Sequence, residues 1–130
     1  MTIEFNWYDD TQQILIVSLA SDLTWEAAHQ ASQALLQLTL ARSYPIALIL
    51  SFPRDFQLPL SGIAENTKKI FRDHQKTPIV EMAIVTANPE LWRTFVQMYS
   101  SGNTRYHYVS CLADALDAIQ ANILDTDSSS

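Results

Sequence analysis

The fold of this chain is decided by residues 45–53, PIALILSFP. Ile46 to Leu50 form an unbroken run of apolar, mostly branched residues, which is typical of a strand buried on both faces of a sheet. Pro45 stops the preceding helical pattern from resuming, and Pro53 opens a loop. A strand covered on both faces needs other elements packed on the sheet, so the stretch predicts an α/β fold with Ile46–Leu50 as its central strand.

Two strands and a helix precede this central strand. Apolar and polar residues alternate along Ile3–Trp7, and Ile14–Leu19 is more continuously apolar. The turn chemistry of Asp9–Thr11 joins the two strands as an antiparallel hairpin. Thr24 is placed to cap the helix that follows, in which alanine and leucine recur on one side.

The remaining elements alternate between helix and strand. Ser61 can cap a second helix, and Asn88 followed by Pro89 is a strong start for a third. Val80–Val85 and Arg105–Val109 are the last two predicted strands, and a final helix follows them. The element order is β-β-α-β-α-β-α-β-α, which predicts a mixed, mostly parallel sheet with right-handed crossovers and helices packed on it.

We interpret the chain as a single α/β domain over residues 1–124, followed by a polar tail over residues 125–130 that we expect to be disordered. No internal repeat or linker divides the 130 residues.

The composition favours a cytoplasmic protein. Cys111 is the single cysteine, so no disulfide can form within the chain. We expect no membrane span and no export signal, because the apolar runs are short and the first ten residues carry acids. The formal net charge of −6, with 8 lysines and arginines, argues against nucleic acid as a partner.

The order of elements and the residues at their junctions resemble the SpoIIAA-like branch of the STAS fold, over nearly the whole chain. The stretches that carry the resemblance are Leu23–Ala28, Ile46–Pro53, Leu60–Ile63, Val80–Thr86, Asn88–Pro89 and Ala113–Leu116. The resemblance implies a regulatory protein-interaction module with no enzymatic activity, like the antagonists of anti-sigma factors. The identity of a protein partner and the formation of a homodimer stay open.

Phosphorylated members of that family begin their second helix with Asp-Ser-Ser/Thr-Gly-Leu, in which the serine after the aspartate accepts the phosphate. Here Pro59 replaces the aspartate and Leu60 replaces the acceptor, so that only Ser61 remains. We interpret Ser61 as a helix cap, with phosphorylation of Ser61 as the alternative.

The sequence gives no sign of catalysis, a cofactor or a metal. It contains two glycines, too few for a phosphate-binding loop or a dinucleotide fingerprint, and no Gly-x-Ser-x-Gly elbow. His29, His74 and His107 lie on three different predicted elements, without the spacing of metal ligands. We therefore expect a protein that binds rather than catalyses.

The loop after the central strand is the predicted binding surface. It lies at the carboxyl end of a parallel strand, where open α/β sheets place their ligand crevices. Its apolar residues lie outside regular structure, so they are available for contact with a protein partner. The predicted binding residues are Phe52, Arg54, Asp55, Phe56, Leu58, Leu60 and Ser61. The alternative function is a carrier or sensor of a small hydrophobic, lipid-like ligand, for which the same loop would cover a cavity.

Overall fold

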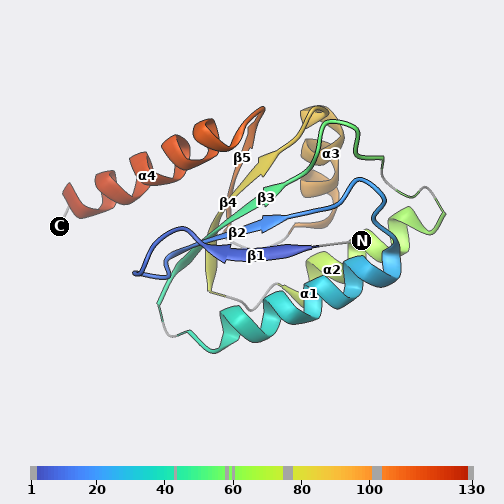
Figure 1. Cartoon of the computed structure of the whole chain (residues 1–130), viewed down its shortest axis with the longest axis horizontal. Coiled ribbons are helices and arrows are strands. Elements are labelled where there is room, and N and C mark those ends of the chain that lie inside the picture. The colour runs from blue at the N-terminus through green and yellow to red at the C-terminus, as the bar shows by residue number, and fades with distance from the viewer. Residues whose placement is uncertain are drawn as a thin grey trace.

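The computed structural model describes residues 3–42, 44–57, 59, 61–74, 78–100 and 104–128, with the backbone alone from residue 121. Strands and helices alternate along these residues after an opening pair of strands, as the sequence predicts (Figure 1). The strands are β1 (Glu4–Trp7), β2 (Ile14–Ser18), β3 (Ile46–Ser51), β4 (Ile79–Val85) and β5 (Arg105–Val109). The helices are α1 (Trp25–Leu40), α2 (Ile63–Asp73), α3 (Pro89–Tyr99) and α4 (Leu112–Ser128).

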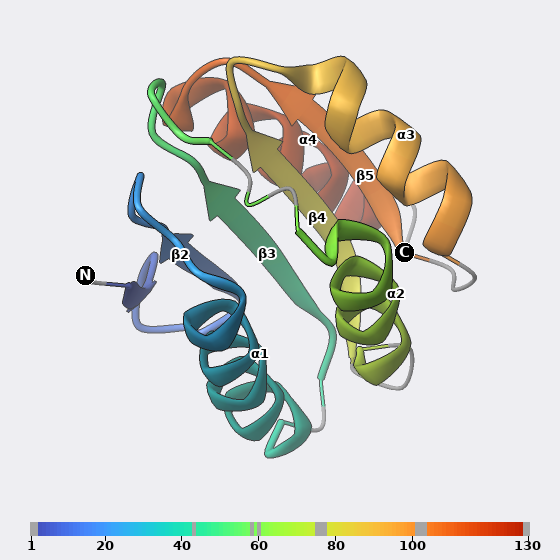
Figure 2. The ribbon, with the colours of Figure 1, turned by 90° about the vertical axis from the view of Figure 1, so that its right-hand side faces the viewer.

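The strands form one mixed sheet in the order β1-β2-β3-β4-β5. β1 pairs antiparallel with β2, and every other pair is parallel. Each crossover from β2 onward moves one strand in the same direction, so right-handed connections put α1, α2 and α3 on one face. Figure 2 shows these three helices in front of the sheet and α4 behind it. The predicted α/β fold with a mostly parallel sheet is confirmed.

β3 is the central strand, as its apolar run predicts. Ile46 and Ile49 are 0% exposed, and Leu48 is 1% exposed. Ile49 faces α4 within a cluster that includes Ile119 of that helix. Leu48 faces the opposite side, in a cluster with Leu35 of α1. The alternating side chains of β3 therefore contribute to both core layers.

Two of the predicted helix starts are confirmed, and a third is wrong. The Thr24 hydroxyl accepts a hydrogen bond from the Ala27 backbone N–H at the start of α1. The Asn88 side chain accepts one from the Leu91 N–H at the start of α3. Before α2, however, the cap position is Gly62 and not Ser61.

Gly62 replaces Ser61 as the cap because the chain turns sharply there. Its φ of +71° lies in the left-handed region, which a residue without a Cβ adopts at little cost. The Asn66 side-chain amide then donates a hydrogen bond of 2.7 Å to the Gly62 carbonyl. Ser61 lies in the exposed turn before this residue, one position too early to cap α2.

The final helix extends past the domain end that we placed at residue 124. α4 runs to Ser128, across most of the predicted polar tail. Residues 125–128 contain neither proline nor glycine, so nothing in their backbone chemistry ends a helix that has already formed. Within the described residues, no helix is both long and apolar enough to span a membrane.

Candidate functional site

The core layer between the sheet and α1–α3 contains a cavity of about 370 Å³ that is partly open to solvent. Side chains of β2, β3 and β4 form its floor, and α1, α2 and α3 form its roof and walls. The described residues that line it are mostly apolar: Phe5, Val17, Leu19, Leu23, Trp25, Ala28, Ala31, Ser32, Leu35, Leu48, Leu50, Phe52, Thr67, Ile70, Phe71, His74, Ile79, Val80, Met82, Ile84, Trp92, Ser100, Thr104 and Tyr106.

Small residues on α1 leave this space unfilled. Ala28, Ala31 and Ser32 lie on consecutive turns of the helix side that faces the cavity. α2 packs against α1 and α3, and neither α1 nor α2 approaches the sheet as closely as α4 does on the other face. Short side chains on a helix that is held away from the sheet cannot reach across the gap. The cavity is therefore a product of the packing of the helices.

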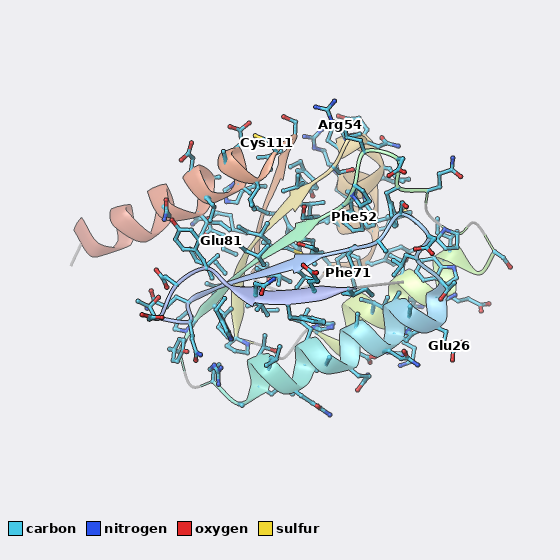
Figure 3. The ribbon with its side chains drawn as sticks, in the orientation of Figure 1. Glu26, Phe52, Arg54, Phe71, Glu81 and Cys111 are labelled. Atoms are coloured by element: carbon cyan, nitrogen blue, oxygen red, sulfur yellow. The ribbon has the colours of Figure 1, made fainter. Side chains whose placement is uncertain are left out.

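Aromatic side chains close the cavity at the carboxyl end of the sheet. Phe52 stacks on Trp92 with ring centroids 4.4 Å apart, and Phe56 lies 4.7 Å from Phe52 on the outer side. Phe95 meets the Trp92 ring edge-on at 5.7 Å. Figure 3 shows Arg54 and Glu26 pointing outward at the rim of the molecule, whereas Phe52 and Phe71 line the cavity. This aromatic wall, Phe52, Phe56 and Trp92, separates the cavity from the surface.

Two pairs of polar side chains in the cavity are joined by hydrogen bonds, whereas the buried Trp25 indole N–H has no hydrogen-bond partner in the described structure. The Ser32 hydroxyl and the His74 Nε2 atom lie 2.7 Å apart, joining α1 to the end of α2. Burial lowers the pKa of His74 below its usual value, so its imidazole is neutral at pH 7. Burial likewise raises the pKa of Tyr106, whose hydroxyl accepts a hydrogen bond from Ser100. None of the described lining residues is Asp, Glu, Lys or Arg.

The structure divides the predicted binding residues between the interior and the surface. Phe52 is only 8% exposed and lines the cavity, so it is part of the core. Arg54, Asp55 and Ser61 are exposed, and Phe56 is half-buried. Leu58 and Leu60 lie outside the described residues.

A second hollow lies outside the aromatic wall, at the carboxyl edge of the sheet. Its volume is about 420 Å³, and it lies between residues 53–57 and the turn from β4 into α3. Arg54 and Phe56 line one side of it, while Asn88 and Leu91 line the other. Trp92 borders both this hollow and the inner cavity. We call it the edge hollow.

The three histidines lie apart, in separate hydrogen bonds. The His29 Nε2 atom is 2.6 Å from the Asn66 side chain, and the His107 Nε2 atom is 2.7 Å from the Glu81 carboxylate. The second pair explains how Glu81 fits in a buried strand, a partnership that the sequence did not predict. Among the described residues, no group of three His, Cys, Asp or Glu side chains could hold a metal.

Comparison with known proteins gives no match: no family model fits the sequence, and neither a curated protein nor a solved structure resembles it closely enough to count as a relative. The site is therefore interpreted from its own geometry.

Proposed function

We propose that this protein binds a small hydrophobic molecule between its sheet and α1–α3, as a carrier or sensor. The observation that carries the proposal is the apolar cavity of about 370 Å³. Ligand pockets are typically about 300–1,000 Å³ and are lined mainly by hydrophobic and aromatic side chains with a few polar groups. The cavity has both the size and the composition of such a site.

The energetics of an empty cavity support the same proposal. The cavity is partly open to solvent, so its apolar lining faces water when no ligand is bound. Removing apolar surface from water is favourable by about 25 cal/mol per Å². A ligand that covers this lining would gain that free energy and raise the stability of the complex.

The outer surface gives less support to a large apolar interface. The large hydrophobic residues that are clearly exposed belong to different parts of the described chain: Tyr8, Leu40, Val80, Met98 and Leu112. Singly exposed apolar residues are normal on a soluble surface, whereas interfaces gather them into contiguous patches.

The test is a thermal-shift screen of small hydrophobic compounds against the wild type and Ala31→Leu. The added leucine side chain enters the cavity, so compounds that stabilise the wild type should lose most of their effect on this variant. The matched control is Gln33→Leu, exposed on the same helix and outside the cavity lining, which should respond like the wild type. A screen in which no compound stabilises the wild type, or in which both variants respond equally, contradicts the proposal.

The edge hollow favours a second candidate function, a regulatory protein-interaction module of STAS type. Arg54 and Asp55 are exposed beside this hollow, and Phe56 forms part of its wall. Interfaces combine such an aromatic anchor with a polar rim. Phe56→Ala should then abolish the retention of a partner that the wild type purifies from its native cell extract. Equal retention by both proteins would count against this function.

A further inference from the structure

We propose that the cavity selects an uncharged ligand that carries one hydroxyl or carbonyl group, and that this group binds at the Ser32–His74 pair. This inference rests on the proposed function and specifies the chemical class of its ligand. Three features of the described residues support it: the absence of charged side chains in the lining, the position of the polar pair, and the volume of the cavity.

The lining disfavours a charged group that is buried inside the cavity. A carboxylate or ammonium group that leaves water needs an opposite charge or several strong hydrogen bonds, and without them its burial is very unfavourable. No acidic or basic side chain among the described lining residues could supply that charge. The ion pair nearest in sequence to the cavity, Lys69 with Asp73, lies on the exposed side of α2, where its two members bond to each other. An anionic or cationic lipid therefore meets no counter-charge among the lining residues that the structure describes.

The Ser32–His74 pair supplies the polar contact. Ser32 is 6% exposed and lies among apolar lining residues of α1. A hydroxyl group has one donor and two acceptor sites, so its bond to the His74 Nε2 atom leaves capacity for a second partner. A ligand hydroxyl or carbonyl that reaches Ser32 would gain a hydrogen bond among apolar side chains, and this bond would also fix the orientation of the ligand.

The volume sets the size of the ligand. At about 30 Å³ for each non-hydrogen atom, the share of one molecule in liquid water, the cavity accommodates about a dozen such atoms. 1-Decanol has this size, an apolar chain and one hydroxyl. Decanoate and decylammonium match its chain length but carry a negative and a positive charge.

The experiment titrates the full chain at pH 8 with these three compounds and with naphthalene, which is apolar and has no hydrogen-bonding group. Binding is measured by isothermal titration calorimetry, which follows all four compounds in the same way. We expect 1-decanol to bind roughly 100-fold more tightly than either charged compound, because each tenfold step corresponds to about 1.4 kcal/mol and the burial of an unpaired ion costs several. Ser32→Ala should weaken 1-decanol binding by about 3- to 10-fold and leave naphthalene binding unchanged, as expected for one lost neutral hydrogen bond.

The outcomes separate this inference from the proposed function. Decanoate or decylammonium binding as tightly as 1-decanol overturns the selection for uncharged ligands while hydrophobic binding stands. An equal affinity of the wild type and Ser32→Ala for 1-decanol overturns the role of the Ser32–His74 pair. If neither 1-decanol nor naphthalene binds, the proposed function itself fails. Naphthalene binding to Ser32→Ala serves as the control that the variant is folded and its cavity intact.

Discussion

The substitution Ala31→Leu should stabilise the protein in the absence of any ligand. Ala31 lines the cavity, and the three additional carbon atoms of leucine would occupy about a quarter of its volume at roughly 30 Å³ each. Each buried methylene contributes about 0.8 kcal/mol, or about 2.4 kcal/mol for three. The loss of leucine rotamers and its slightly lower helix propensity oppose this by about 1 kcal/mol. We expect a net gain of about 1 to 1.5 kcal/mol.

The assay is urea denaturation of the purified proteins, followed by circular dichroism. Ala31→Leu should raise the midpoint without changing the slope, because the surface exposed on unfolding is nearly the same. Gln33→Leu, exposed on the same helix and outside the lining, should shift the free energy of unfolding by no more than about 0.5 kcal/mol. A destabilised Ala31→Leu would refute the reasoning, since it would mean that the space beside α1 is already filled. An equal increase in the free energy of unfolding of both variants would also refute the reasoning, because the gain would then not depend on the cavity.

Three further predictions concern the strand β3 and the two ends of α2. Ile49→Ala should lower the free energy of unfolding by about 2 to 5 kcal/mol, because Ile49 is 0% exposed at the centre of β3; a denaturation midpoint close to that of the wild type would contradict this. Gly62→Ala should be destabilised by about 1 to 2 kcal/mol in the same assay, since its φ is +71° and a Cβ would lie 2.8 Å from the Asn66 amide nitrogen; equal stability would show that the turn relaxes. The folded-state pKa of His74 is lowered by burial below the usual 6.5, so the unfolded chain binds more protons at acidic pH. His74 should make its full contribution to the free energy of unfolding above about pH 6.5. This contribution should decline as the pH falls through 6.5 toward the lower folded-state pKa, by at most about 1.4 kcal/mol per pH unit. His74→Gln should flatten this decline between about pH 7 and 5, and parallel profiles of the two proteins would exclude His74 as its source.

The fold was predictable because its signals are local. The apolar run Ile46–Leu50 needs no distant residue to indicate a buried strand, and Thr24 and Asn88 cap their helices through neighbours three residues away. Ser61 misled the prediction because serine is a good cap by residue type, whereas the actual start depends on the left-handed turn at Gly62. Residue type predicts a helix N-cap well where the backbone path is ordinary, but not where a glycine in the left-handed region sets the start of the helix, as Gly62 does.

The cavity was not predictable from the apolar pattern of the sequence, because it depends on the distance between the sheet and the helices α1–α3. Ala28, Ala31 and Ser32 look like an ordinary helix face, and only the placement of α1 and α2 relative to the sheet turns them into a cavity wall. The predicted loop follows β3 at the carboxyl edge of the sheet, but its first aromatic residue, Phe52, packs inward on Trp92. Small residues on α1 do not by themselves indicate a void, because the same pattern also lets a helix pack closely on a sheet.

The order of the strands in the sheet has a consequence for how the chain folds during synthesis. Since every strand lies beside its predecessor, each new strand finds its pairing edge already in place as it leaves the ribosome. The crossover helices α1, α2 and α3 are synthesised between the strands that they connect, so they can cover their face of the sheet early. The opposite face, with Ile14, Ile49 and Ala83, stays exposed to water until α4 arrives. The growing chain therefore carries an uncovered apolar face until α4 is made, and an exposed apolar face of this kind favours aggregation.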